Sequence, residues 1–126
     1  MGDAEEEKPA KFLFLMKKAP HGSIYPYEGL EVILIMAAYD QLINVAFVED
    51  GVLSLVKGQD TSAIGVKDFS NTLRILEDYG VEHLYVDKES LEARGLKEED
   101  LITPVEVVEK EKISSVMREQ DVVLPF

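Results

Sequence analysis

The chain has no cysteine, no tryptophan and only two histidines. Without a thiol it can form no disulfide, no thiolate zinc site and no iron–sulfur cluster, and it offers no thiol nucleophile. Its histidines, His21 and His83, are too few for an imidazole-rich metal site. We therefore expect no bound metal and no cofactor. Asn and Gln are scarce beside abundant Glu and Lys, a composition typical of thermophile proteins.

Basic residues are in the minority: 13 Lys and Arg stand against 25 Asp and Glu, for a formal net charge of -12. Nucleic acids and anionic membranes both require a cationic surface, so we expect neither as a direct partner. No apolar segment reaches the ~20 residues that span a bilayer. Residues 1–10 are acidic and polar, unlike a signal peptide, and are predicted to form a disordered arm. We expect a cytoplasmic protein whose single domain covers residues 11–126.

Short apolar runs alternate with helical patterns along the rest of the chain. The predicted strands are 12–16, 44–48, 82–86, 104–108 and 121–124. The predicted helices are 26–39, 69–79, 87–94 and 109–118, with a short helical turn ending at Leu55. Residues 57–66 and the acidic run 98–100 are predicted to be loops. The alternation predicts one three-layer α/β/α domain built on a five-stranded parallel sheet.

The helix predicted at 26–39 is apolar on almost every side. A helix that rests on a sheet needs a single apolar stripe, so a second surface should cover the remainder. In a domain of this size we expect that surface to be another subunit. The predicted interface residues are Ile33, Ile35, Met36 and Tyr39. The alternative is that 32–36 forms a strand, against which Pro26 and the adjacent alanines argue.

Polar residues gather in the loop that follows the first strand. They are Lys17, Lys18, His21, Gly22 and Ser23, with Lys57 expected nearby after the second strand. The loops at the carboxyl ends of parallel strands are where ligands and partners bind in open α/β sheets. A local cationic rim on an acidic chain could attract a small anion or an acidic partner. The alternative is solvated lysines beside a Pro-His-Gly turn.

Several familiar sites are absent from the sequence. The glycines form neither G-x-G-x-x-G nor a Walker A pattern. A receiver domain needs an acidic pair after its first strand, where this chain has Lys17 and Lys18. The loop after the first strand is also a poor match for a flavodoxin phosphate loop. His83 lies within a predicted strand and is interpreted as structural.

The ordered motifs of the chain resemble those of the DsrF/TusC family of sulfur-relay subunits. The matching segments are Ala19-Pro20-His21-Gly22, Glu28-Gly29-Leu30-Glu31, Asp50-Gly51-Val52, Gly58-Gln59, Ser90-Leu91, Arg94-Gly95-Leu96 and the final residues 121–126. The resemblance covers about residues 12–126. It implies a five-stranded parallel α/β/α domain that assembles with DsrE/TusD-like and DsrH/TusB-like partners, in tRNA 2-thiouridine synthesis or in dissimilatory sulfur metabolism.

In such complexes persulfide sulfur passes between cysteines, and the resemblance implies that the DsrE/TusD-like subunit carries the principal one. This chain departs from the family pattern at Pro26-Tyr27, where a Gly-Arg pair is common. It also has residues 83–87 where relatives can carry cysteines. We expect a non-catalytic subunit of a sulfur-relay complex. The alternative is an independent homo-oligomeric protein of the same fold that binds a small anion.

Overall fold

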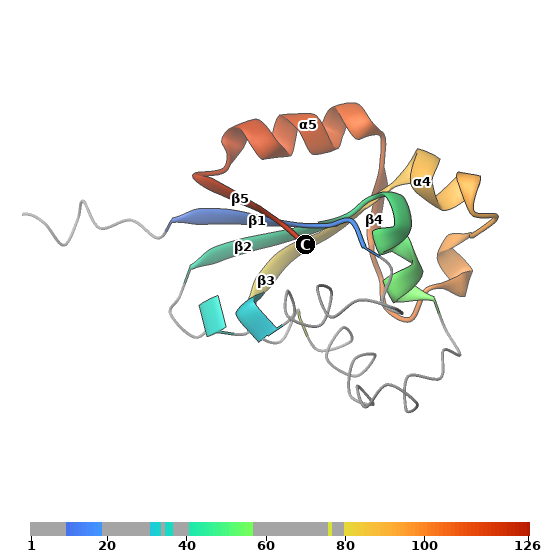
Figure 1. Cartoon of the computed structure of the whole chain (residues 1–126), viewed down its shortest axis with the longest axis horizontal. Coiled ribbons are helices and arrows are strands. Elements are labelled where there is room, and N and C mark those ends of the chain that lie inside the picture. Colours follow the sequence, from blue (N-terminus) through green and yellow to red (C-terminus); the bar gives the residue numbers. More distant parts are fainter. Residues whose placement is uncertain (1–9, 19–30, 34, 37–40, 57–75, 77–79) are drawn as a thin grey trace, which may run out of the picture.

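The computed structural model describes residues 10–18, 31–33, 35–36, 41–56, 76 and 80–126. Five strands in this part of the chain form a single sheet (Figure 1). Their bounds are β1 Lys11–Met16, β2 Leu42–Phe47, β3 Val81–Asp87, β4 Glu106–Val108 and β5 Val122–Pro125. Every neighbouring pair is parallel. The five predicted strands and their parallel arrangement are confirmed, with ends displaced by one or two residues.

The described helical elements agree with the sequence predictions, with the exception of η4 (Glu98–Asp100). They are the 3-10 helix η1 Glu49–Leu55, α4 Lys88–Ala93, the 3-10 helix η4 Glu98–Asp100 and α5 Lys110–Glu119. Residues 31–33 and 35–36 are also helical, inside the helix predicted at 26–39. The remainder of that helix, most of 69–79 and the predicted arm lie outside the described residues.

The prediction that the acidic run 98–100 is a loop was wrong. This segment forms the 3-10 helix η4. The backbone N–H of Lys97 donates to the Asp100 carboxylate at 2.8 Å, and the Asp100 N–H donates to the Lys97 carbonyl at 2.9 Å. These reciprocal bonds close one helical turn. The charges of this segment indicated a solvated loop, but the Asp100 side chain can also cap a helical turn by accepting a backbone hydrogen bond.

The strand order β4-β3-β2-β1-β5 determines which face each connection covers. From β1 to β4 the chain steps across the sheet in one direction, and β5 then returns to the far side of β1. Parallel crossovers are right-handed in nearly all proteins, so the last connection must cross the face opposite to the others. Accordingly, Figure 1 shows α5 on one face of the sheet and η1 and the helical residues 31–33 and 35–36 towards the other.

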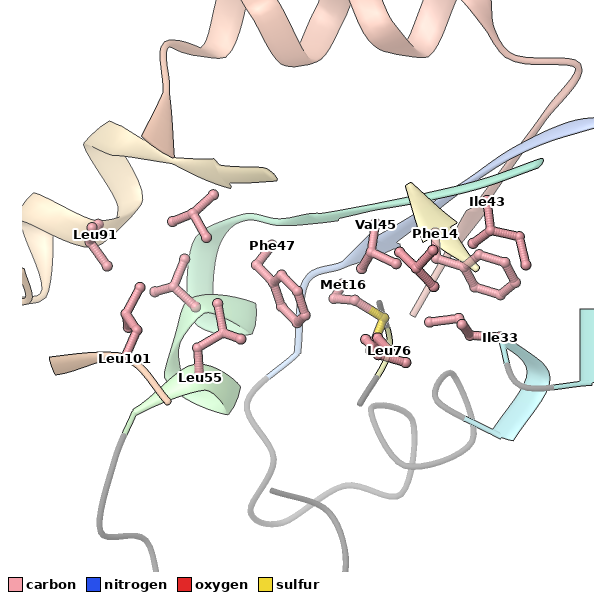
Figure 2. Close-up of a cluster of buried hydrophobic side chains, with 13 residues drawn as sticks. Phe14, Met16, Ile33, Ile43, Val45, Phe47, Leu55, Leu76, Leu91 and Leu101 are labelled. Carbon is pink, nitrogen blue, oxygen red and sulfur yellow. The ribbon is translucent and has the colours of Figure 1, made fainter. Parts of the chain in front are cut away.

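Each face of the sheet has its own buried cluster. The larger one joins β1, β2, η1 and α4 with Ile33 and Leu76 (Figure 2). Its members are Phe14, Met16, Ile33, Ile43, Val45, Phe47, Val52, Leu55, Leu76, Val81, Val86, Leu91 and Leu101. The smaller one, beneath α5, consists of Leu13, Ala46, Tyr85, Ile113 and Val116. Full burial of one such aliphatic side chain contributes about 1.5–3 kcal/mol, so the larger cluster dominates the stability of the fold.

Candidate functional site at the carboxyl end of the sheet

The carboxyl end of β1 is joined to the last residue of the chain. The backbone N–H groups of Lys17 and Lys18 donate to the main-chain oxygen of Phe126 at 2.7 and 3.3 Å. The Phe126 N–H donates to the Leu15 carbonyl at 2.8 Å, and its ring stacks on Phe14 with centroids 5.7 Å apart. The segment after β5 therefore fixes the direction in which the chain leaves β1.

A cleft of about 350 Å³ opens at this junction, lined by Lys17, Lys18, Pro125 and Phe126. Both lysines are exposed. The cleft thus combines an apolar floor with two ammonium groups, which suits an anion or an acidic side chain. Of the predicted members of the site, Lys17 and Lys18 are described, and both line this cleft. His21, Gly22, Ser23 and Lys57, the other predicted members of the site, lie outside the described residues.

Gly51 attaches η1 to the end of β1. A Cβ atom at this position would lie 1.9 Å from the carbonyl oxygen of Met16. Real side chains do not approach backbone atoms so closely, so only glycine fits here. This contact gives a physical reason for the Asp50-Gly51-Val52 motif, which places η1 beside the site formed by Lys17 and Lys18.

The ends of β2 and β3 are joined by a buried network around Ser90. Asp87 caps α4 by accepting from the Ser90 N–H at 3.1 Å, and the Ser90 hydroxyl donates to the same carboxylate oxygen. The Ser90 hydroxyl oxygen also accepts from the Glu49 N–H at 2.8 Å. Glu49 has a φ of 51°, in the left-handed region that disfavours side chains. The hydrogen bond to Ser90 offsets part of that strain.

An ion pair closes the same region at the surface. Arg94 donates to Asp50 through Nη2 at 2.8 Å and Nε at 3.2 Å, and its Nη1 donates to the Ser90 carbonyl at 3.0 Å. The Asp50-Gly51-Val52, Ser90-Leu91 and Arg94-Gly95-Leu96 motifs therefore meet in space, although they are far apart in sequence. Gly95 has a φ of +68° and ends α4, as a C′ glycine does.

Two buried oxygens in this region have no hydrogen-bond partner, Asp87 Oδ1 in the network and Ser54 Oγ in η1. The groups described at this end of the sheet are ammonium, guanidinium, carboxylate and hydroxyl. They can bind, orient and neutralise charge. They supply no sulfur nucleophile, because the chain has no cysteine.

The predicted interface residues on the first helix occupy different environments. Ile33 is fully buried in the larger core cluster, and Met36 packs against that cluster while partly exposed. Ile35 is 57% exposed, and it is the one large hydrophobic residue with high exposure in the described part of the chain. Tyr39 lies outside that part. Ile35 is therefore the predicted interface residue that is accessible to a second subunit.

A polar cluster near the amino end of β3 was not predicted from the sequence. His83 Nδ1 lies 2.5 Å from Glu106 Oε2 across the β3–β4 pair, and both side chains are about half exposed. The His83 ring stacks on Tyr85, with centroids 5.3 Å apart and an interplanar angle of 15°. Burial raises the pKa of Tyr85 above its usual value near 10.0, and Glu106, Glu119 and Glu82 raise it further. His83 thus pairs with Glu106 and stacks on Tyr85 at the surface of the sheet.

Nowhere among the described residues do three or more His, Asp or Glu side chains gather as metal ligands would. Their helices are also too short or too polar to cross a membrane.

Comparison with known proteins assigns the chain to a family. Residues 10–126 match the model of the DsrE/DsrF-like family, and the chain belongs to that family. It is 47% identical to "Intracellular sulfur oxidation protein DsrF" of Allochromatium vinosum, over 92% of this chain and 96% of that protein. It is 36% identical to a "Protein TusC homolog" of Vibrio vulnificus, over 93% and 99% of the two chains.

Solved structures agree on the fold. The crystal structure of the ychN protein from E. coli superimposes with a TM-score of 0.81 at 21% identity, covering 93% of this chain and 99% of that one. A protein of unknown function from Methanobacterium thermoautotrophicum gives a TM-score of 0.68 at 17% identity, covering 92% and 99%. At these identities the likeness shows the α/β fold alone.

Proposed function

We propose that this protein is a non-catalytic subunit of a sulfur-relay complex. The carrying observation is a full-length match to a DsrF protein in a chain that has no cysteine. On this proposal the protein works in the cytoplasm beside a cysteine-bearing DsrE/TusD-like subunit, with a DsrH/TusB-like subunit as a further partner. The pathway served is tRNA 2-thiouridine synthesis or dissimilatory sulfur metabolism.

The chemistry of sulfur relay explains why the missing thiol matters. In each transfer a thiolate attacks the outer sulfur of a persulfide, and the donor thiolate leaves. One sulfur–sulfur bond forms as another breaks, so the step needs no outside oxidant but does need a thiol on the acceptor. This chain cannot be the acceptor. Its contribution is to support the partner that is.

Covalent labelling tests the non-catalytic role. The purified protein is incubated with a cysteine desulfurase and free cysteine, and its intact mass is then measured. We expect no added sulfur, whereas a cysteine-bearing partner in the same mixture should gain it. A stable adduct of one sulfur atom on this chain would overturn the proposal.

Ile35 is the proposed subunit contact on the first helix. A large apolar side chain that is 57% exposed adds to an apolar patch that association would bury. Light scattering at micromolar concentration should show at least a dimer, and Ile35→Glu should shift the population towards monomer. Ser114→Glu, an exposed substitution on α5, is the control. A monomeric parent protein would contradict this contact.

Lys17 and Lys18 are the proposed partner-binding groups of the cleft at the carboxyl end of β1. Changing both to Ala should leave stability within about 0.5 kcal/mol, since exposed substitutions usually cost little. It should weaken association with an acidic partner and flatten its salt dependence, because surface charges act largely on the association rate. The paired change of Lys110 and Lys112 to Ala, on α5, is the control. Unchanged association in the Lys17 and Lys18 variant would remove the cleft from the proposal.

The alternative function, a homo-oligomer that binds a small anion, is favoured by the same cleft. Titration with inorganic phosphate or sulfite, in the absence of any partner, distinguishes the two. Saturable binding that depends on Lys17 and Lys18, combined with no association to a cysteine-bearing subunit, would favour the alternative.

A further inference from the structure

In the described part of the chain, β4 is an edge strand of the sheet, with β3 as its single strand neighbour. The outer side of such a strand presents N–H and C=O groups in the geometry that a further strand requires. The residues beside β4 determine which peptide could pair with this outer side.

A first cleft, of about 230 Å³, lies at the amino end of this edge. Its lining residues are Val81, Glu82, Leu84, Pro104, Val105 and Glu106. Four of them are apolar, and Glu82 places an exposed carboxylate at the rim, while the Glu106 side chain pairs with His83. A Lys or Arg side chain has the matching form, because its aliphatic stem packs on apolar walls while its cationic head stays at the surface.

A second cleft, of about 420 Å³, lies further along β4 against α4. Leu91, Leu96 and Val107 give it an apolar floor. Its rim carries both charges, with Lys88, Glu92, Lys97 and Glu98. Leu91 is nearly buried, whereas Leu96 and Val107 are partly exposed and pack against the larger core cluster. This cleft suits an apolar side chain, which would bury surface that now contacts water.

The two clefts lie one strand repeat apart. Val105 lines the first and Val107 the second, and both pack against the same core cluster, so they belong to one face of the sheet. Residues two positions apart on a strand are separated by about 6.6 Å. Alternate side chains of an added strand have the same spacing. A cationic residue and an apolar residue at positions i and i+2 would therefore occupy both clefts at once.

We propose that the β4 edge binds an extended segment of a protein partner by strand addition, with a Lys or Arg in the first cleft and an apolar residue in the second. Main-chain hydrogen bonds to β4 supply affinity, and the two clefts supply specificity, as in other strand-addition complexes. This surface lies away from Lys17, Lys18 and Ile35, and its use does not depend on the sulfur-relay assignment.

Charge favours a basic segment at this edge over an acidic one. Residues 77–126 contain 14 acidic and 6 basic side chains. Glu82 is exposed and lines the first cleft, so its carboxylate lies at the rim. The Glu106 carboxylate pairs with His83 on the α5 side of the sheet. A cation in the first cleft therefore gains from Glu82, whereas an acidic segment would be repelled.

Fluorescein-labelled peptides test the proposal on the full chain. The probes are Thr-Thr-Lys-Thr-Ile-Thr-Thr and its reverse, since the added strand can run in either direction. We expect saturable binding by anisotropy for at least one of them. Replacing Lys by Glu in that peptide should weaken binding at least fivefold. Binding of neither probe, or equal binding of the Glu peptide, would overturn the proposal.

Variants of the protein locate the site. Glu82→Gln removes one rim carboxylate and should weaken the Lys peptide about two- to fivefold, the range expected for an exposed ion pair. Glu111→Gln makes the same charge change on the outer surface of α5 and should leave binding unchanged. Equal effects from the two substitutions would mean general electrostatic attraction, and would contradict a site at β4.

Methylated peptides separate strand addition from side-chain adhesion. Two peptides are made, each with N-methyl groups on one of the two alternating sets of amides. Only one of these sets faces β4 in an added strand. We expect one methylated peptide to lose binding and the other to retain it. Retention by both would show that no main-chain ladder forms, and would overturn strand addition.

Discussion

The two ends of β3 are built on different principles. At its carboxyl end Asp87 and Ser90 are buried, and they join η1 to α4 through hydrogen bonds. Near its amino end His83 and Glu106 form a pair that is about half exposed, above the buried Tyr85. The carboxyl end contains three motifs of the DsrF/TusC resemblance, and buried hydrogen bonds and a close backbone contact stabilise it. Near the amino end, the described interaction is an ion pair at the surface.

Because of this difference, we expect substitutions at the carboxyl end of β3 to change stability. Substitutions near its amino end should change mainly the electrostatics. Buried hydrogen bonds and backbone contacts are expensive to lose, because a group left without a partner retains its desolvation penalty. Exposed ion pairs contribute little, because water and salt screen them. Three substitutions measure this contrast, from the largest expected effect to the smallest.

Gly51→Ala should be the most damaging. Its Cβ would overlap the Met16 carbonyl oxygen, and both backbones would have to move. We expect a loss of about 3 kcal/mol or more in the free energy of unfolding, measured by urea denaturation.

Gly95→Ala is the matched control for Gly51→Ala. Gly95 has a positive φ but open space around it, so strain alone should cost about 1 kcal/mol. If the two substitutions cost the same, the close approach of η1 to β1 is not what stabilises this end.

Ser90→Ala should have an intermediate effect. It removes the acceptor of the Glu49 N–H and one donor to Asp87, so we expect a loss of about 1–3 kcal/mol. Ser114→Ala, at an exposed position of α5, should change stability by less than about 0.5 kcal/mol. A Ser90 variant as stable as the parent would show that the network is not needed.

Glu106→Gln should act mainly on the titration of Tyr85. Burial, the largest cause, keeps the pKa of Tyr85 above 10.0, while the loss of the Glu106 charge lowers it partway. The chain has five tyrosines, so absorbance titrations of the Glu106→Gln and Tyr85→Phe proteins are each compared with the parent. An unchanged Tyr85 titration in the Gln variant would contradict the electrostatic role of Glu106.

The same shift predicts how stability depends on pH. The folded-state pKa of Tyr85 is raised, so its contribution is fully present below the unfolded value near 10 and is lost as the pH rises through the folded value. Denaturation midpoints above pH 10 should therefore fall less steeply in Tyr85→Phe than in the parent. Equal slopes would contradict the raised pKa.

The sequence predicts the strands of this fold better than its contacts. β1, β2 and β5 are short, mainly apolar runs, which are typical of buried parallel strands, whereas β3 and β4 also contain charged residues. The strand order follows from no local pattern, and neither does the ion pair between Asp50 and Arg94, which are 44 residues apart. Such pairings depend on how the elements pack. The residue pattern of a single sequence does not show which distant segments pack together.

The candidate site was predictable in part for the same reason. Lys17 and Lys18 follow a recognisable strand, so their place at its carboxyl end could be expected. The role of Phe126 in closing their cleft could not, because it depends on β5 pairing beside β1. Likewise, the apolar pattern marked Ile33 and Ile35 alike, but packing buries the first and exposes the second.

Sulfur transfer in a reconstituted complex tests the central claim most directly. The protein is mixed with a cysteine-bearing DsrE-like subunit, loaded by a cysteine desulfurase, and examined by native mass spectrometry followed by the masses of the separated chains. We predict a stable complex in which the partner gains sulfur and this chain gains none. Sulfur on this chain, or a partner that never associates with it, would contradict the proposed role as a non-catalytic subunit.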